Sequence, residues 1–280
     1  MTQLRLTIGA RAQRFPLLPL VAYVVVCLVL DLGLLRIYPL AGTPMFGDAH
    51  SWWTIDLGHL YDQAVTSLTG QGAFFRYSPA VAVILEPLRL LPWTTYIVGL
   101  TVVQVAAAIW MGGRRSALLI LIFPGVVLEL MAGNIELLMA AAIVAGFRWP
   151  AAWSFLLLTK VTPGVGVLWF AFRREWRSLA IALGATVAIA AVSFVLTPDL
   201  WAQWARALVE MSGLPNPTFW PPLWLRLPAA VALLWWGART DRRWVVPVVA
   251  LVAMPTIWPI SFALLAGAIA LRRTRPSRTA

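Results

Sequence analysis

The sequence predicts an all-α, polytopic integral membrane protein with about ten transmembrane helices. Hydrophobic residues make up 61% of its 280 residues and charged residues only 12%, and the mean hydropathy is +0.81. A soluble chain is about half apolar and about a quarter charged. The 16 Trp and 20 Pro are typical of interfacial aromatics and broken helices. At about 20 residues per crossing, we expect a single membrane domain over residues 1–280.

Apolar runs define the expected spans. The first covers 15–38, follows Arg5, Arg11 and Arg14, and is interpreted as a retained helix. Pro124, Pro163, Pro255 and Pro259 interrupt later runs, so we expect kinked or discontinuous helices there. The further spans are expected at 78–91, 93–112, 116–131, 134–147, 151–172, 178–196, 223–238, 244–256 and 257–271.

The net charge of +11 comes almost entirely from arginine, because Lys160 is the single lysine among the 22 basic residues. The arginines stand in short clusters between apolar runs. This pattern encodes membrane orientation, so we expect no nucleic-acid partner. With the N-terminus in the cytoplasm, the clusters at 173–177, 239–243 and 272–278 are cytoplasmic, whereas 114–115 is not. Both termini are then cytoplasmic, and the long polar segments 39–77 and 197–222 form the outward, active face.

Several site classes find no support in the sequence. It has one cysteine, Cys27, and two histidines, so neither a disulfide framework nor a multi-histidine metal site is expected. No Walker motif, dinucleotide fingerprint, HExxH or GxSxG occurs. We therefore expect no metal and no cofactor.

The first outward segment is rich in polar side chains. It holds Asp48, Asp56 and Asp62 together with both histidines, His50 and His59. Read as a helix, residues 55–69 place an apolar stripe on one face and Asp56 and His59 on roughly the opposite face. Such a helix would lie in the membrane surface. A carboxylate beside an imidazole there could act as a general base; the alternative is a solvated face that only keeps the helix at the interface.

Lys160 is unusual because it lies deep in an apolar run. It is nine residues into the 151–172 span, about 14 Å along a helix, where a charge costs about 2.5–3.5 kcal/mol. It should therefore face the protein interior or a water-filled cavity. It could bind an anionic ligand such as a lipid phosphate, form an ion pair with Glu136 or Glu129, or extend to the membrane surface.

Two further features have a functional and a structural interpretation. Asn134 and Glu136 begin an apolar span, where they could make a polar helix–helix contact or line a pocket. Tryptophans in the outward segments could stack on sugar rings or form a membrane-interface belt. These tryptophans are Trp52, Trp53, Trp201, Trp204 and Trp220.

Several short segments follow one another in a distinctive order: DLGHLYDQA (56–64), Gly70 and RYSPA (76–80), EPLRLLP (86–92), GNIELL (133–138), KVTP (160–163), RREWR (173–177) and 216–226. This order resembles glycosyltransferase family 87, whose members are polytopic bacterial enzymes of the C-type glycosyltransferase superfamily. Two positions depart from the family pattern. The Gln and Asn of the middle motif are Asn134 and Glu136 here, and 258–261 (WPIS) lacks the late Trp-x-His histidine, which His50 or His59 could replace.

The resemblance implies an activity and a set of site residues. The enzyme would transfer a hexose, with mannose the expected sugar, from a polyprenyl-phosphate donor to an extracytoplasmic lipid or glycan acceptor at the bacterial cell membrane. Inverting transfer needs a carboxylate base, assigned to Asp56 with Asp48 in reserve, and cations beside the phosphate. The phosphate candidates are Arg76, Lys160 and Arg206, and the sugar or acceptor candidates are His59, Tyr77, Trp52, Trp53 and Asn134.

Two other functions remain open from the sequence. A lipid or solute carrier would line its path with Lys160 and Glu136, and would be expected to show an internal repeat, which we do not see. A non-catalytic partner of envelope-glycan enzymes would tolerate replacement of Asp56 and Lys160.

Overall fold

The computed structural model describes residues 17–40, 45–61, 75–212 and 221–272, and all regular structure in these ranges is helical. The first part holds α1 (Leu17–Leu40), α2 (Gly47–Trp53), α3 (Pro79–Leu85), η1 (Glu86–Leu90), α4 (Trp93–Leu121), α5 (Pro124–Ala132) and α6 (Glu136–Gly146). Next come η2 (Pro150–Ala152), α7 (Trp153–Thr159), η3 (Thr162–Val167), α8 (Leu168–Phe172), α9 (Trp176–Leu196) and α10 (Pro198–Ser212). The last described elements are α11 (Leu223–Arg239), α12 (Val245–Val252), η4 (Pro259–Leu264) and α13 (Leu265–Leu271).

The long apolar helices confirm the all-α membrane class. Three described helices are long and apolar enough to cross a membrane, and they contain Leu18–Ile37, Trp93–Gly113 and Trp176–Leu196. A fourth span is present if α5 and α6, bent by 117°, count as one. The expected number of ten spans is not confirmed, because the runs at 78–91, 151–172 and 257–271 are divided into short α and 3-10 pieces.

The prolines lie at helix breaks, as the sequence predicts. Pro124 begins α5 and Pro259 begins η4, while Pro163 is the second residue of η3. Pro255 lies between α12 and η4. Proline has no amide hydrogen and a fixed φ, so the first turn of a helix accommodates it at no cost, whereas a helix interior loses a hydrogen bond, as at Pro228 within α11.

The break between α5 and α6 depends on Gly133. This residue ends α5 in the left-handed region, with φ of 67°, where a side chain is strained. A Cβ on Gly133 would also lie 2.6 Å from the Ala49 side chain of α2. The backbone N–H of Phe46 donates to the Met131 carbonyl over 2.7 Å. Glycine at 133 therefore allows α2 to pack directly on the break.

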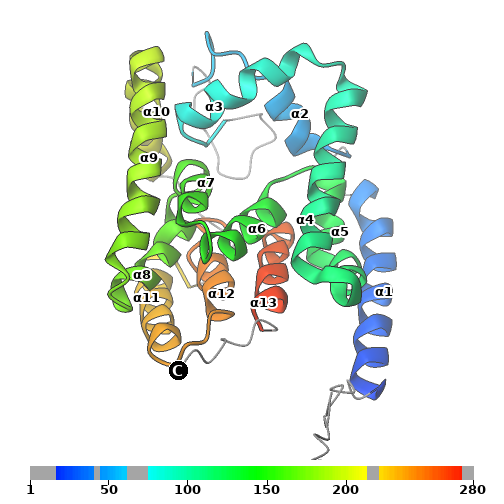
Figure 1. Ribbon diagram of the computed structural model, residues 1–280. Coiled ribbons are helices and arrows are strands. Elements are labelled where there is room, and N and C mark those ends of the chain that lie inside the picture. Colours follow the sequence, from blue (N-terminus) through cyan, green and yellow to red (C-terminus); the bar gives the residue numbers. More distant parts are fainter. Residues whose placement is uncertain (1–16, 41–44, 62–74, 213–220, 273–280) are drawn as a thin grey trace, which may run out of the picture.

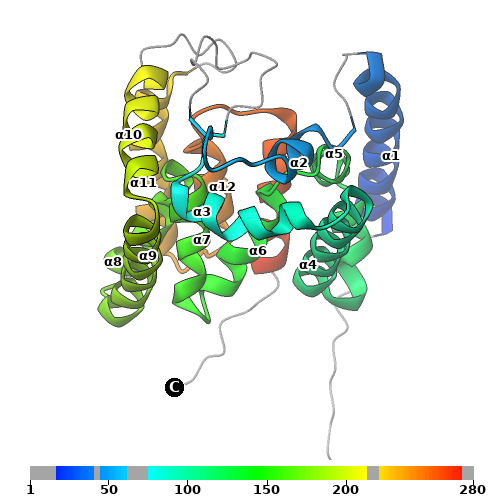
Figure 2. The ribbon, with the colours of Figure 1, turned by 90° about the horizontal axis from the view of Figure 1, so that it is seen from above.

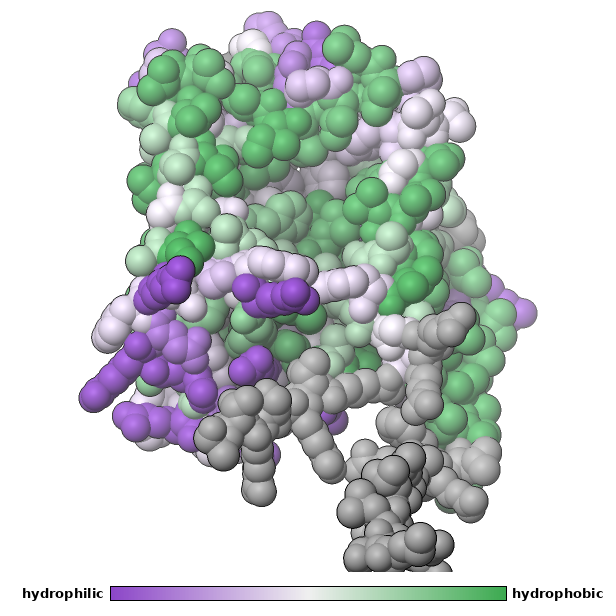
Figure 3. All heavy atoms as spheres, viewed as in Figure 1, coloured by the Kyte–Doolittle hydropathy of each residue, from purple (hydrophilic) through white to green (hydrophobic). Residues whose placement is uncertain are grey.

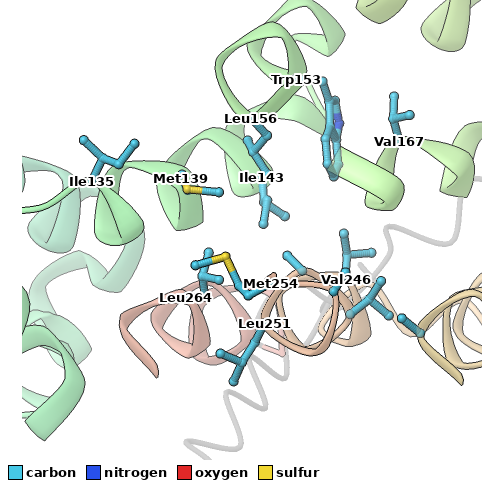
Figure 4. Close-up of a cluster of buried hydrophobic side chains, with 14 of the residues drawn as sticks. Ile135, Met139, Ile143, Trp153, Leu156, Val167, Val246, Leu251, Met254 and Leu264 are labelled. Carbon is cyan, nitrogen blue, oxygen red and sulfur yellow. The ribbon is translucent and has the colours of Figure 1, made fainter. Parts of the chain in front are cut away.

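Short helices form the centre of the protein, with α1 and α9 at opposite edges (Figures 1 and 2). Met139 and Ile143 of α6 lie opposite Met254 and Leu264 in the buried cluster, and Trp153 of α7 lies beside the residues of η3 and α12 (Figure 4). Inside a membrane the surrounding lipid is as apolar as these side chains. Close packing, rather than exclusion of water, therefore holds such helices together.

The expected helix over 55–69 is wrong for residues 55–61, which form turns after α2 ends at Trp53; residues 62–69 lie outside the described ranges. The Oδ1 atom of Asp56 accepts a 3.0 Å hydrogen bond from the backbone N–H of Gly58. This Asx turn competes with helical hydrogen bonding, and Gly58 itself disfavours a helix. The two segments that the sequence predicts to face outward, 39–77 and 197–222, nevertheless contain helices, α2 in the first and α10 in the second.

Candidate functional site

The break between α5 and α6 brings together polar side chains from distant parts of the chain. The Nδ2 of Asn134, at the break, donates to the Asp48 Oδ2 of α2 over 2.6 Å. The Nζ of Lys160, which follows α7, lies 2.5 Å from the Oε1 of Glu136, the first residue of α6. We call Asp48, Asn134, Glu136 and Lys160 the polar cluster. Three of them are candidates from the sequence, and the structure places them together.

Backbone contacts fix the orientation of Asn134. The side-chain amide of Gln104, fully buried in α4, donates to the Asn134 carbonyl over 2.6 Å. The Oδ1 of Asn134 accepts the N–H of Ile135 over 2.7 Å. With its oxygen engaged in this way, the side chain of Asn134 presents its NH2 group to Asp48.

The ion pair of Lys160 confirms one of the alternatives left open by the sequence. Its side chain is 19% exposed and that of Glu136 is 2% exposed. Glu129 of α5 is also fully buried, and its Oε1 accepts the N–H of Leu137 over 3.0 Å. Among the described residues, the Oε2 atoms of Glu129 and Glu136 have no hydrogen-bond partner. The surroundings of Lys160 are therefore rich in carboxyl groups.

The electrostatics of the site centre on Asp48. Burial raises the pKa of its carboxyl above the ordinary value of 3.8, and the nearby Glu136 raises this pKa further. Lys160, the hydrogen bond from Asn134 and Arg76 act in the opposite direction. Burial, followed by the carboxyls of Glu136 and Asp48, holds the pKa of Tyr77 well above 10. Perturbed pKa values are typical of functional sites, although structural networks also produce them.

The segment 75–78 carries Tyr77 and Arg76 to the polar cluster. The Tyr77 ring lies edge-on to Trp52 of α2, with 5.7 Å between the ring centroids. The Tyr61 hydroxyl donates to the Tyr77 carbonyl over 2.7 Å, and the Ser78 hydroxyl donates to the Leu158 carbonyl of α7 over 2.7 Å. The segment is thus held between α7 and the turns at 55–61.

An apolar cavity of about 330 Å³ adjoins the cluster. Two of its lining residues are chain neighbours of the polar cluster: Ile135 lies between Asn134 and Glu136, and Thr159 precedes Lys160. The face of the molecule seen in Figure 3 is hollowed in the middle, and mostly hydrophobic residues surround this hollow. The other lining residues come from α2, segment 75–78, α3, η1, the connection after η1, α4, α6 and α7: Trp52, Tyr77, Val81, Leu85, Leu88, Leu91, Thr95, Tyr96, Gly99, Leu100, Val103, Leu138 and Phe155.

The remaining sequence candidates lie outside the polar cluster. Asp56 and His59 are exposed on the turns at 55–61. Trp53 faces His50 and Trp93, with ring centroids 5.9 and 5.5 Å away, and its Nε1 donates to a backbone carbonyl of the α3–α4 connection. Arg206 is exposed on α10. The structure does not test the roles of these residues, which stay predictions.

Sequence reasoning missed Gln104 and named Glu129 only as a possible ion-pair partner of Lys160, whereas Glu136 was also considered as lining a pocket or the path of a carrier. Gln104 was detectable as an amide in the middle of the apolar 93–112 span, since buried polar groups need partners. Among the described residues, no group of three His, Cys, Asp or Glu side chains could hold a metal ion. The expectation that no metal or cofactor is needed stays a prediction.

The fold and the site define a helical membrane protein in which a buried polar cluster meets an apolar cavity. Residues 74–280 match the family model of glycosyltransferase family 87, and the chain belongs to this family. It is accordingly a glycosyltransferase, which favours the enzyme over the carrier and the non-catalytic partner. The matched range includes Asn134, Glu136 and Lys160, whereas Asp48 and Asp56 precede it. No curated protein and no solved structure matches the chain.

Proposed function

We propose that this glycosyltransferase moves a hexose, mannose in our assignment, from a polyprenyl-phosphate donor to an extracytoplasmic lipid or glycan acceptor, with inversion. One observation carries the proposal: the polar cluster adjoins the apolar cavity, whose lining residues Ile135 and Thr159 are chain neighbours of the cluster residues. A donor of this class has the same two-part character, because a charged phosphate joins a sugar to a long hydrocarbon chain. The cavity would hold the isoprenoid units nearest the phosphate.

Lys160 and Arg76 are the cations for the phosphate. The phosphate gains negative charge as the sugar leaves, so a fixed cation lowers the barrier most at that stage. Lys160 is paired with Glu136 in the free protein, and the donor phosphate would compete with that carboxylate. Arg206 on α10 is the third candidate; α10 is joined to the site by the Trp204 Nε1, which donates to the Arg76 carbonyl over 3.4 Å.

Polar and aromatic groups beside the phosphate suit a sugar. The paired Asp48 and Asn134 offer hydrogen bonds to hydroxyl groups, and the edge-to-face pair of Trp52 and Tyr77 offers ring surfaces. Trp53 and His59 lie further out and are assigned to the acceptor. No metal takes part in the proposed reaction.

We assign the general base to Asp56. The base takes the proton of the acceptor hydroxyl as that oxygen attacks the anomeric carbon and the phosphate departs. The acceptor arrives from the water side, where the exposed Asp56 is held by its turn with Gly58. Asp48 is the second candidate, supported by its raised pKa and its place in the polar cluster.

The orientation follows from the two ends of α6. Glu136 begins this helix at the polar cluster, and Phe147 and Arg148 follow its other end. The Arg243 guanidinium lies 5.2 Å from the centroid of the Phe147 ring, so this end lies beside the arginines of 239–243. An arginine-rich end is normally cytoplasmic. The cluster would then face the outside of a bacterial cell membrane, with both termini in the cytoplasm.

The test is sugar transfer from a labelled mannosyl-phosphate-polyprenol by the purified protein in liposomes with acceptor lipid extract. Asp56→Asn should lower kcat by about 10²–10⁴-fold with the donor KM unchanged, whereas Asp48→Asn should mainly raise the donor KM. The reverse pattern moves the base to Asp48. Near-native turnover by both variants would overturn the assignment of a carboxylate base to this segment, and labelled product formed only from a nucleotide sugar would overturn the donor class.

A further inference from the structure

A second apolar hollow lies on the outside of the molecule, between α8 and α11. Its volume is about 680 Å³, and all of its lining residues are apolar: Phe172, Leu227, Pro228, Val231, Ala232 and Trp235. The small side chains of Pro228 and Ala232, one turn apart on α11, leave space between the larger rings of Phe172 and Trp235. We call this hollow the α8–α11 groove.

The length and the ends of the groove suit one leaflet of a bilayer. Leu227 and Trp235 are eight residues apart, about 12 Å along α11, and half of a hydrocarbon core is about 15 Å. Trp235 is 50% exposed at the end of the groove that precedes Arg239. An exposed tryptophan at one end of an apolar helix surface is typical of a membrane interface, so the groove extends from that interface toward the middle of the bilayer.

Arginines surround the groove at the Trp235 end. The Arg239 guanidinium stacks over the Trp235 ring, 5.6 Å from its centroid. None of the salt bridges among the described residues involves Arg239. Arg173, directly after Phe172, instead binds Glu175 and Asp241 over 2.8 and 3.0 Å. The hydrophilic residues at this end gather at the lower left of the space-filling view (Figure 3).

Positive charge exceeds negative charge at the Trp235 end of the groove. Segments 173–177 and 239–243 contain six arginines and two carboxylates, and both carboxylates already bind Arg173. Clustered basic groups beside membrane helices attract anionic headgroups. A ligand that matches both the apolar groove and the arginines at its end has one anionic phosphodiester and at least one acyl chain.

We propose that the α8–α11 groove binds one anionic phospholipid, with an acyl chain against Val231 and Ala232 and its phosphodiester at Arg239. This site is separate from the polar cluster, which lies at the other end of the short helices, and the lipid is not a substrate there. Its binding ties the short α8 to α11 from outside.

The experiment measures lipid retention by the full-length protein in detergent, using native mass spectrometry. The probes are phosphatidylglycerol, phosphatidylcholine with the same acyl chains, and glycerol 1-phosphate without chains. Wild type should retain phosphatidylglycerol about fivefold better than phosphatidylcholine, since one basic residue near an anionic headgroup contributes about 1 kcal/mol. Arg239→Gln should abolish this preference, and Ala232→Phe should reduce retention of both lipids by filling the groove.

Arg148→Gln is the matched control. Arg148 is also exposed and stacks on a tryptophan, with 4.8 Å to the Trp149 centroid, but neither residue lines the groove. It should keep the wild-type preference. Equal loss in Arg148→Gln would show attraction by surface charge alone and overturn the proposal. Full retention by Ala232→Phe, binding of glycerol 1-phosphate as tight as that of the lipid, or a second copy of the chain occupying the groove would also overturn it.

Discussion

The charged groups at the two ends of α6 differ in number, in burial and in the partners that they contact. At the polar cluster the charged groups are few and mostly buried, and they bind other side chains at 2.5–2.6 Å, as in Lys160–Glu136 and Asp48–Asn134. At the arginine-rich end they are numerous and mostly exposed, and they stack on aromatic rings. Arg148, Arg242 and Arg272 lie 4.8, 4.8 and 4.6 Å from the centroids of Trp149, Trp236 and Trp244.

The difference follows from the environment of each end. An ion removed from water needs a partner, and loss of that partner leaves a buried charge that nothing compensates. An exposed guanidinium keeps its water, so a stacked ring adds only about 0.5–1 kcal/mol. Substitutions at the polar cluster should therefore be costly and reversed by a second substitution in the partner, whereas those at the arginine-rich end should be small and independent.

The largest effect is expected for Lys160→Met. It leaves the Glu136 carboxyl buried beside Glu129 without its cation. Breaking a buried pair on one side costs about 3–5 kcal/mol, so the unfolding midpoint in detergent should fall clearly. Circular dichroism on heating measures the change.

The double variant Lys160→Met/Glu136→Gln is the control for this prediction. It removes both charges, and most of the lost stability should return. A double variant as unstable as Lys160→Met alone would mean that the lysine acts through packing and not through its charge.

A smaller loss is expected for Gly133→Ala, which tests the backbone of the break. The alanine would hold φ of 67° and place its Cβ 2.6 Å from the Ala49 side chain. Strain and displacement of α2 should together cost about 2–3 kcal/mol and should weaken donor binding, since α2 carries Asp48. Gly184→Ala on α9, where a Cβ meets nothing within 4 Å, should lose no stability. Equal losses in both variants would contradict the role of the break.

The fold class and the helix breaks were predictable because they depend on local sequence. Apolar runs define helices in a membrane, and prolines divide these runs where a new helix begins, as at Pro124, Pro163 and Pro259. The number of spans was not predictable, since α6, α7 and α12 are apolar but too short to cross alone. The prediction of a helix over 55–69 is wrong for 55–61, because the Asx turn at Asp56 outweighs the hydrophobic periodicity.

The sequence predicts the site only as separate polar residues in unusual positions. Lys160 and Asn134 stand out as polar residues in apolar runs, and Asp48 as an acid in a segment that the sequence predicts to face outward. The pairing of Asp48 with Asn134 requires the bend of 117° between α5 and α6 and the close approach of α2. Both are tertiary features, so the sequence does not contain them in any single segment.

The pH dependence of stability should separate Asp48 from exposed acids. Because the pKa of Asp48 in the folded protein is raised above 3.8, the folded protein binds more protons than the unfolded chain at pH values between its folded and unfolded pKa. The free energy of unfolding therefore falls as the pH rises through that window, with a limiting slope of about 1.4 kcal/mol per pH unit. Asp48→Asn should make this decline shallower when the unfolding midpoint is followed from pH 4 to pH 8. Asp199→Asn, on exposed α10, should keep the wild-type slope, and an unchanged slope in Asp48→Asn would assign the decline to another group.

The smallest effect is expected at the arginine-rich end. Arg242→Gln removes a guanidinium that stacks over Trp236 at 4.8 Å in an exposed position. Because this group keeps its water, the free energy of unfolding should fall by no more than about 1 kcal/mol. High salt should leave this difference between the wild type and Arg242→Gln almost unchanged. Combining it with Lys160→Met should give additive losses, because the two residues lie at opposite ends of the short helices. A loss as large as that of Lys160→Met, or strong coupling between the two, would show that charge at both ends stabilises the protein in the same way.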